Sequence, residues 1–550
     1  MLRLISLAAA VATFPASAVA QDMVLRGGTI HTGVEAAPTA EVVVVRDGRI
    51  VWTGPAEGAP VEGLPVVELN GATLFPGFTD AHAHLDGIGW RELTLNLEGS
   101  ASVAEAMARL SDWAAAHPEG PIVGRGWIET HWPEGRFLTR QDLDAAAPGR
   151  IVLLSRADGH AVVASSAALQ AAGVTAETQA PFGGDILKDE AGEPNGMLID
   201  AAETLVAGLM PQADAAAKRE AYRAGFSVYA RYGWTGVHFM SAPWGDIPLL
   251  EQMAEAGEAP LKVYNSVTPD GAMPLIQGGP RDVGDGRIIT RAIKLYADGA
   301  LGSRGAALFE PYADASHTTG LMQTTVEDTM PIYEAALRGG IQLATHAIGD
   351  RGNASVADWY ETALTTVPPA ERPNGADVRW RIEHAQILRP SDYADFERLP
   401  IIASMQPSHA IGDLHFAPAR LGDARLDGAY AWNSLADRGV IVAGGSDAPV
   451  ERGDPLIEFY AAVARRDLNG FQGPDWRPDE AVDRLTALRM FTLWPAYASF
   501  REDELGTIQV GKRADFTAFD IDLMTVPAER IPTGRAVLTI VDGRIVHDAR

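Results

Sequence analysis

Two histidines near the start of this 550-residue chain stand one residue apart, directly after an apolar run. Residues 80–84 read DAHAH, and alternation along an extended chain points the side chains of His82 and His84 to the same side. Two imidazoles on one side can hold a single divalent ion. Further metal-type residues occupy or end later apolar runs: Lys294, His346, His384 and Asp447. One histidine in such a place is more often structural, but the whole series in this order predicts a metal centre.

Short β-branched runs alternate with alanine-rich stretches through most of the chain, which is the pattern of βα units and a parallel sheet. Alanine-rich helices are predicted over residues 103–116, 213–232 and 326–338. Eight inner strands are predicted, over residues 78–82, 235–240, 261–267, 292–296, 342–346, 380–384, 401–405 and 440–444. Eight strands close a (β/α)8 barrel, so the predicted fold class is α/β with a TIM-type barrel. Catalytic groups of such barrels lie at the carboxyl ends of the strands, where the metal-type residues fall.

The barrel region, residues 76–504, is much longer than the roughly 250 residues typical of such a barrel. We therefore expect residues 95–204, between the first two predicted strands, to form an inserted cap subdomain. Apolar runs at residues 122–123 and 151–154 are assigned to this insert.

Both ends of the chain carry a hairpin signal. Asp-Gly pairs flanked by β-branched residues predict hairpins over residues 45–51 and 540–546. We expect these hairpins to pair into one small sheet. The two ends would then form a composite β-sandwich domain from residues 21–75 and 505–550.

The first 20 residues predict a secretory signal peptide. Arg3 gives a positive start, residues 4–14 are apolar, and residues 18–20 read AVA, a small-residue cleavage site. A buried helix is the alternative, whereas a transmembrane anchor would need about 18 uninterrupted apolar residues. We expect a periplasmic or secreted mature protein without a membrane anchor, and the absence of cysteine excludes a lipobox there.

Composition narrows the classes of function. The 45 Lys and Arg against 72 Asp and Glu give a net charge of −27, which repels phosphate backbones and argues against nucleic-acid binding. Zero cysteines exclude disulfides, thiol catalysis and thiolate metal sites. Histidine, carboxylate, lysine or hydroxyl groups must therefore carry the chemistry, and a small-molecule substrate is expected.

Five further motifs show a family resemblance. Residues 75–84 read FPGFTDAHAH, 511–515 GKRAD, 124–127 GRGW, 158–161 DGHA and 298–304 DGALGSR. With them the chain resembles the amidohydrolase superfamily, within it the amidohydrolase-3 branch of YtcJ-like and N-substituted formamide deformylase-like proteins. The resemblance implies a (β/α)8 barrel, a β-sandwich made by both termini, and a centre of one or two metal ions, commonly zinc.

The resemblance also implies roles for the metal-type residues. His82 and His84 would bind the more buried ion with Asp447, and His346 and His384 would bind the second. Lys294 would bridge the ions as a carbamate, because burial lowers the pKa of a lysine and leaves a neutral amine that reacts with carbon dioxide. Such ligands suit Zn²⁺, while Mn²⁺, Fe²⁺ and Co²⁺ stay open.

Catalysis would then use a metal-activated hydroxide that attacks a polarised carbonyl, with Asp447 as the general acid and base. Candidate substrate-binding residues are His160, Arg304, Trp127, Tyr296, Gln406 and His409. Each has a simpler alternative: His160 as a turn residue, Arg304 as a partner of a nearby acid, Trp127 as packing. Asp80 and Glu383 are expected to orient imidazoles by accepting their free N–H groups.

The leading hypothesis is a hydrolase of non-peptide carbon–nitrogen bonds, acting on an amide or N-substituted formamide. An esterase, lactonase or dipeptidase-like hydrolase on the same site is one alternative, since pocket shape decides the substrate. A non-catalytic periplasmic binding or regulatory protein is the other. Exposed apolar surface on the insert or the sandwich could support a homodimer.

Overall fold

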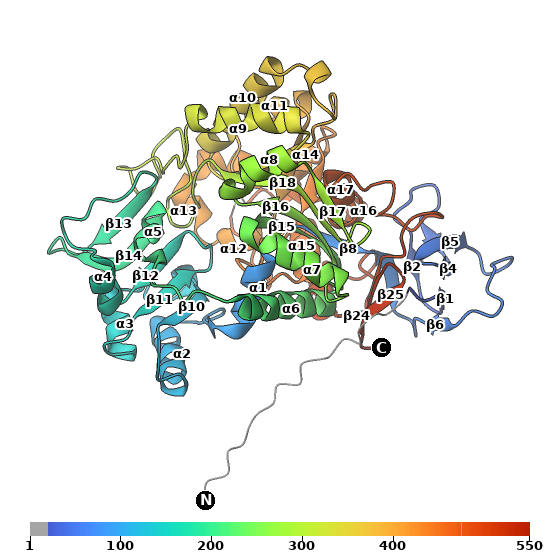
Figure 1. Ribbon diagram of the computed structural model, residues 1–550, viewed down its shortest axis with the longest axis horizontal. Coiled ribbons are helices and arrows are strands. Elements are labelled where there is room, and N and C mark those ends of the chain that lie inside the picture. Colours follow the sequence, from blue (N-terminus) through green and yellow to red (C-terminus); the bar gives the residue numbers. More distant parts are fainter. Residues whose placement is uncertain (1–19, 475) are drawn as a thin grey trace, which may run out of the picture.

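The computed structural model describes residues 20–474 and 476–550, so the predicted signal peptide, apart from Ala20, lies outside the described residues. Figure 1 shows a central barrel, an inserted sheet on one side of it and smaller sheets on the other, where the C-terminus lies. Among the described helices, none combines the length and the apolar character that crossing a membrane requires.

Within the described residues, eight parallel strands follow one another around the barrel in chain order. They are β8 (Phe78–Ala83), β15 (Trp234–Ala242), β16 (Lys262–Val267), β18 (Ile288–Tyr296), β19 (Gln342–Ala347), β20 (Trp380–His384), β21 (Ile401–Met405) and β22 (Val442–Gly444), and the short β17 (Arg281–Val283) pairs with β18 outside this path. Loops join the two ends of the sheet: Asp447 N–H donates to the His82 carbonyl at 2.6 Å, and His84 N–H to the Ala448 carbonyl at 2.7 Å. The predicted barrel is confirmed as a nearly closed parallel barrel.

Helices cover the outside of the barrel because their apolar faces bury against the strands. Helix α1 begins directly after His84 and crosses α6 at very close range. A Cβ atom on Gly89 would lie 1.8 Å from the Ala221 carbonyl oxygen, so only glycine fits there. The helices of this region are α1 (Leu85–Leu93), α6 (Ala215–Tyr232), α7 (Ile247–Glu255), α8 (Ala272–Gly278), α9 (Val326–Gly339), α10 (Asp350–Thr366), α11 (Tyr393–Arg398), α12 (Pro407–Asp413), α13 (Ala417–Leu421), α14 (Trp432–Ala436), α15 (Pro455–Ala464), α16 (Arg484–Phe491) and α17 (Leu493–Ala498).

Between β8 and β15 the chain builds a second sheet, in the order β13-β14-β12-β11-β10-β9. Its elements are β9 (Leu95–Asn96), β10 (Ile122–Trp127), β11 (Val152–Arg156), β12 (Ala161–Ala164), β13 (Gly184–Lys188) and β14 (Pro194–Asp200), with α2 (Val103–Ala116), α3 (Arg140–Ala146), α4 (Ser166–Ala172) and α5 (Thr204–Ala207). Leu110 of α2 and Leu143 of α3 are buried in one apolar cluster with Trp127 of β10. The three predicted alanine-rich helices are present as α2, α6 and α9.

Strands from the two ends of the chain form two further sheets, ordered β5-β4-β1-β6 and β25-β24-β23-β7-β2-β3. They are β1 (Met23–Arg26), β2 (Ile30–His31), β3 (Thr39–Ala40), β4 (Val42–Arg46), β5 (Arg49–Gly54), β6 (Val66–Glu68), β7 (Thr73–Pro76), β23 (Phe516–Phe519), β24 (Ala536–Val541) and β25 (Arg544–Asp548). The antiparallel pair β7–β23 joins the two ends directly. At the start of β8, Phe78 N–H donates to the hydroxyl of Thr517, 439 residues further along.

Both predicted hairpins are present, as β4–β5 and β24–β25. In each turn the Asp and the Gly have positive φ, at Asp47 and Gly48 and at Asp542 and Gly543. The expectation that the hairpins pair into one sheet is wrong, because they belong to different sheets. Their turns meet, since a Cβ atom on Gly48 would lie 2.9 Å from the Asp542 carbonyl oxygen. Residues of both sheets share one buried apolar cluster.

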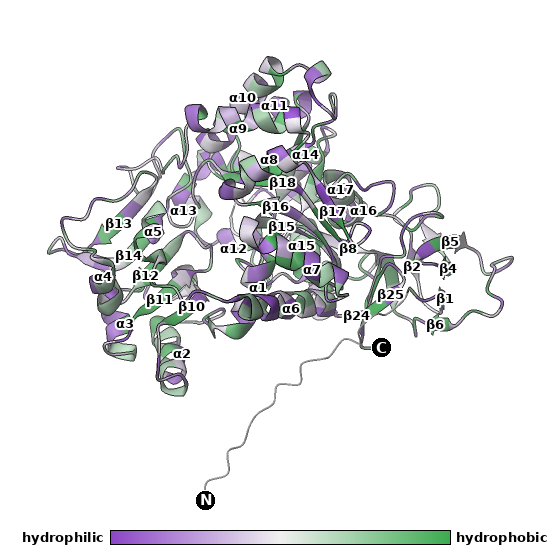
Figure 2. Cartoon of the chain, viewed as in Figure 1, coloured by the Kyte–Doolittle hydropathy of each residue, from purple (hydrophilic) through white to green (hydrophobic). Residues whose placement is uncertain are grey.

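Hydropathy follows this architecture. In Figure 2 apolar colour gathers on the strands, while hydrophilic colour appears on outward-facing parts of the surrounding helices. Charged residues are almost never fully buried unless they are paired. Buried charged residues in this barrel therefore call for partners, and two such groups are described below, Lys262 with its carboxylates and the residues around His82.

Lys262, at the start of β16, anchors the terminal sheet to the barrel. Its Nζ donates to both carboxylate oxygens of Asp515, at 2.7 and 2.6 Å, and to Asp542 at 2.8 Å. Burial lowers the pKa of Lys262. Asp515 and Asp542 raise it, but the effect of burial is larger. Asp515 closes the motif at residues 511–515, so this part of the family signature has a structural role.

We predict that Lys262→Met destabilises the protein by about 3–5 kcal/mol at pH 7, because Asp515 and Asp542 lose their shared cation while buried. Urea unfolding followed by circular dichroism measures the change. Arg535→Met is the matched control, since that arginine is 74% exposed in its ion pair with Asp520 and should change stability by less than about 0.5 kcal/mol. Equal losses in both variants would contradict the anchoring role.

Candidate metal centre

His82 lies at the end of β8 and is fully buried. Its Nδ1–H donates to Glu383 Oε2 at 2.6 Å, which leaves Nε2 as the free lone pair. Burial lowers the pKa of His82 well below its usual value, and the charge of Lys294 lowers it further. The ring is therefore neutral at pH 7, with Nε2 available to a metal ion.

Glu383 is held in turn by Arg381, two residues earlier on β20. Arg381 Nε lies 2.7 Å from Glu383 Oε1, and Arg381 Nη2 donates to the Ala81 carbonyl at 2.6 Å. Its Nη1 donates to Nδ1 of His238 at 2.8 Å. Burial lowers the pKa of His238 well below its usual value, so this histidine is a neutral acceptor. His238 thus supports the metal centre through Arg381, which in turn holds Glu383.

Asp447 follows β22 and faces both histidines of the DAHAH motif. Its Oδ1 lies 3.0 Å from Nε2 of His84 and 3.4 Å from Nε2 of His82, and its backbone has φ +60°, an uncommon value for a non-glycine residue. Burial would raise the pKa of Asp447, but the hydrogen bond and the charge of His84 lower it, and the pKa lies below the usual range.

Asp80 secures the same loop without touching an imidazole. It accepts the Ser446 hydroxyl at 2.6 Å, the Ser446 N–H at 2.9 Å and the Tyr229 hydroxyl at 2.8 Å. Burial raises the pKa of Asp80 to about 6, although the Ser446 and Tyr229 bonds lower it. The expectation that Asp80 orients an imidazole is wrong, because its oxygens hold the strand end next to Asp447 instead.

His384 and His409 approach Asp447 from the other side. His384 Nδ1–H donates to Gln406 Oε1 at 2.8 Å, and Nε2 of His409 lies 3.6 Å from Asp447 Oδ2. Gln406 therefore positions an imidazole rather than a substrate. His409, which was expected to bind substrate, joins His384 and Asp447 in a group of ligand atoms within 4.8 Å of one another.

His346 and Lys294 lie beside this group but outside it. The rings of His346 and His384 are 4.6 Å apart, while His346 Nε2 lies 3.5 Å from Asp298 Oδ1. The ring of His409 lies 5.8 Å from that of His384, so His346 and His409 are both placed beside His384. Lys294 is 1% exposed, and its Nζ lies 4.9 Å from the centre of the Tyr296 ring.

Two buried atoms test whether these residues fit a divalent ion. Nε2 of His82 and Nε2 of His409 have no hydrogen-bond partner in the part of the chain that the structure describes. His82, His84 and Asp447 form a second group of ligand atoms within 4.8 Å of one another. Orphaned imidazole nitrogens beside a carboxylate are the donor set of zinc and its neighbours, so the residues fit such an ion.

His160 reaches the same region from the insert. Its Nδ1–H donates to Asp200 Oδ1 at 2.7 Å, and its ring lies 5.1 Å from that of His346. Burial alone would lower the pKa of His160, but Asp200 outweighs it and raises the pKa to about 9. An imidazolium therefore faces the metal-type residues at neutral pH.

Two predicted substrate-binding residues lie elsewhere. Trp127 is fully buried in the insert, where its Nε1–H donates to the Leu154 carbonyl at 3.0 Å, so it packs the cap. Arg304 pairs with Asp314 at 2.8 Å. These two assignments are corrected. Tyr296 bonds to Ser241 through its hydroxyl and lies beside His346, with ring centres 5.8 Å apart.

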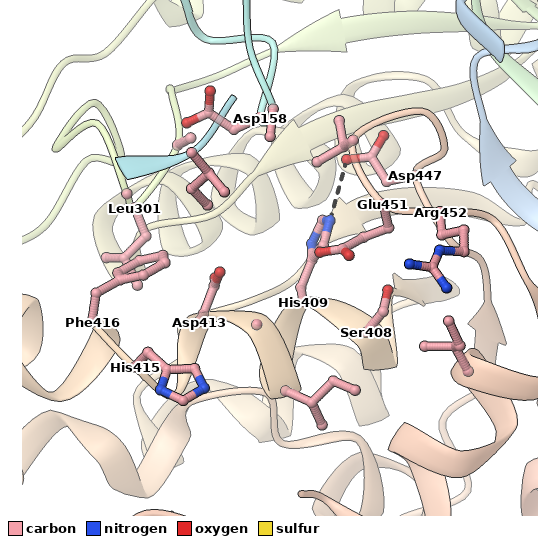
Figure 3. A pocket seen from close by; sticks show the side chains of 18 of the residues that line it. Asp158, Leu301, Ser408, His409, Asp413, His415, Phe416, Asp447, Glu451 and Arg452 are labelled. Atoms are coloured by element: carbon pink, nitrogen blue, oxygen red, sulfur yellow. Dashed lines mark ion pairs between the residues drawn. The ribbon is translucent and has the colours of Figure 1, made fainter. Parts of the chain in front are cut away.

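A pocket of roughly 590 Å³ opens at the centre. The insert, the loop after β22 and helix α12 all line it, and His160, His384, His409 and Asp447 are part of its wall. Figure 3 shows His409 and Asp447 facing each other, with Asp413 and Glu451 close by. The insert thus closes one side of the space in front of the metal-type residues.

Arg125 is a residue that sequence reasoning missed. It lies on β10 inside the GRGW motif and donates to the carbonyls of Pro449 and, at 3.2 Å, Ala157. The side chain therefore ties the insert to the loop that carries Asp447. The charge of Arg125 within the GRGW motif is the signal in the sequence that marks this residue.

We predict that Glu383→Gln lowers metal affinity about 10- to 100-fold, because the amide orients His82 more weakly than the carboxylate. Competition with a chromogenic chelator measures the affinity, and near-UV circular dichroism checks that the fold is kept. Glu397→Gln, an exposed site, is the control. Unchanged affinity in a folded Glu383→Gln protein would remove Glu383 from this role.

Comparison with known proteins agrees with this geometry. The model of the amidohydrolase family matches residues 65–547. YtcJ of Bacillus subtilis, named an amidohydrolase, is 33% identical over 537 residues, 95% of this chain and 98% of that protein. The N-substituted formamide deformylase of Arthrobacter pascens is 28% identical over 547 residues, 96% and 98% of the two chains. The crystal structure of an uncharacterized metal-dependent hydrolase from Pyrococcus horikoshii OT3 superposes with a TM-score of 0.75 at 26% identity, covering 92% of this chain and 99% of that one. The chain therefore belongs to the amidohydrolase family of metal-dependent hydrolases, in its amidohydrolase-3 branch.

Proposed function

We propose that this protein hydrolyses carbon–nitrogen bonds other than peptide bonds, in amides or N-substituted formamides. One observation carries the proposal: His82, His84 and Asp447 converge at the mouth of the barrel, with the neutral His82 oriented by Glu383. The similarity to an N-substituted formamide deformylase over nearly the whole chain supports the choice of substrate class.

His82, His84 and Asp447 would hold one divalent ion, and His346 and His384 would hold a second, with His409 beside them. We propose Zn²⁺, which suits imidazole and carboxylate ligands. Such an ion makes water acidic enough to attack at neutral pH and polarises a carbonyl group. We also propose that Lys294, which is nearly inaccessible at the strand ends, is carboxylated. Its carbamate would then help to hold both ions.

Asp447 moves the proton in this proposal. Its Oδ1 faces His82 and His84, so Oδ2, on the side of His409, is the oxygen left to take a proton from the attacking water. The same oxygen then returns the proton to the leaving nitrogen. His160, protonated through Asp200, donates a hydrogen bond to the carbonyl oxygen as negative charge develops there.

The wider organisation completes the proposal. We propose that residues 95–204 cap the barrel and that residues 21–75 and 505–550 form one β-sandwich domain, which their shared apolar cluster supports. Residues 1–20 would direct export to the periplasm and be removed. The mature protein would act on a small molecule, bind neither nucleic acid nor membrane, and could form a homodimer.

We predict that the zinc-loaded protein releases formate from N-alkyl formamides and that Asp447→Asn lowers kcat about 10²- to 10⁴-fold, because proton transfer at Oδ2 is lost. Enzymatic detection of formate measures the rate, and elemental analysis measures the metal bound to each variant. Arg535→Met is the control for handling and loading.

Matched esters and dipeptides run in the same assay. Faster turnover of either would replace the amide proposal with the corresponding hydrolase. A metal-loaded protein that turns over none of the three classes would favour a binding or regulatory role.

A further inference from the structure

Three carboxylates come together in the pocket wall, beyond the metal-type residues. They belong to helix α12, to the loop after β22 and to helix α15. Asp413, at the end of α12, faces the loop that carries Glu451, and Glu458 lies on α15 behind them. We call these three residues the acidic wall. Figure 3 shows Asp413 and Glu451 on either side of His409. A substrate held at Asp447 would extend along this wall.

The cationic groups of the pocket are already paired. Arg156 binds Glu129 at 2.9 Å and also Asp158, and Arg452 lies 3.5 Å from Glu98. In the same way His160 is paired with Asp200, as described above. None of these cations forms an ion pair with the acidic wall among the described residues, although, against the effect of burial, the charge of Arg452 lowers the pKa of Glu451 and that of Arg156 lowers the pKa of Asp413.

The acidic wall itself is poorly neutralised. Glu458 is 1% exposed; one of its oxygens accepts the Ser408 N–H at 3.0 Å, and the other has no hydrogen-bond partner among the described residues. Glu451 makes no hydrogen bond or ion pair with any residue of the described ranges. Asp413 is bonded on one oxygen, by the Tyr430 hydroxyl at 2.5 Å and by Gln386 at 3.0 Å.

Burial raises the pKa of Glu451 well above its usual value, and the nearby charges of Asp413 and Glu98 raise it further. The pKa of Glu458 is raised in the same way, by burial and then, among the charges, by Glu451. A carboxylate buried without a counter-charge, as Glu458 is, is costly, while Asp413 and Glu451 are half-buried at the pocket. A cation placed between them would remove that cost, whereas an anion would add to it.

The pocket, the orphaned oxygen of Glu458 and the pairing of Arg156, Arg452 and His160 with other carboxylates carry one inference. Resting on the proposed function, we propose that the acidic wall binds a positively charged nitrogen of the substrate. The preferred substrates are then amides that carry an ammonium or amidinium group a few bonds from the bond that is cut. The acidic wall sets specificity and leaves the chemistry to the metal-type residues.

Two formamides with the same number of heavy atoms test this preference. N-(5-Aminopentyl)formamide carries an ammonium group where N-hexylformamide carries a methyl group. We expect kcat/KM to favour the cationic compound about 10- to 100-fold, and Glu451→Gln to reduce that ratio about tenfold. Glu57→Gln, which removes one exposed charge far from the pocket, should leave the ratio unchanged.

A binding experiment on metal-free protein is independent of turnover. Pentylamine, cationic at pH 7, should bind at least about tenfold more tightly than 1-pentanol by isothermal titration calorimetry. Glu451→Gln should remove the difference, and Glu57→Gln should keep it. Zinc titrations of both variants run in parallel.

The outcomes separate the two proposals. Turnover of both formamides at equal rates, with equal binding of amine and alcohol, overturns the acidic wall and keeps the hydrolase. Turnover of neither formamide, with pentylamine still preferred, overturns the proposed reaction and keeps the cation site. A zinc ion lost on Glu451→Gln, without any preference for pentylamine, would make the acidic wall a metal site and overturn this inference.

Discussion

The hydrogen bond from His82 to Glu383 is the contact on which the metal centre depends. It fixes which nitrogen of His82 carries the proton, and therefore which nitrogen can meet an ion. The buried carboxylate of Glu383 is stable because Arg381 supplies the opposite charge. Arg381 itself donates to the backbone of β8 and to His238. One ion pair inside the barrel thus sets the geometry at its mouth.

Loops carry Asp447 and His160 to the mouth of the barrel. Side chains that do not face the metal-type residues hold these loops in place. Asp80 ties the strand end before Asp447, while Arg125 ties the insert to the residues just after it. His160 reaches the pocket only because the insert lies against the barrel. The insert therefore shapes the site as well as covering it.

Much of the architecture could be predicted from the sequence, because period and composition report local structure well. The eight strands, the helices and both Asp-Gly hairpins depend on nearby residues. Sheet membership does not: the hairpins at the two ends look alike, yet they lie in different sheets. The same limit applies to the site. The ends of strands predicted where His82, His384 and Asp447 lie. The partners of Trp127, Gln406 and His409 come from other strands and loops, which no local pattern reports, whereas Arg304 pairs with the nearby Asp314.

The pairing of β7 with β23 has a consequence for how the molecule is made. The N-terminal strands are synthesised first, but their partner lies more than 400 residues later, as the Phe78–Thr517 bond shows. Until the last segment emerges, β7 presents an open edge, and the floor of the barrel lacks the carboxylates that bind Lys262. Contacts this distant in sequence slow folding. Native assembly must therefore be a late event, completed only after the whole polypeptide has left the ribosome.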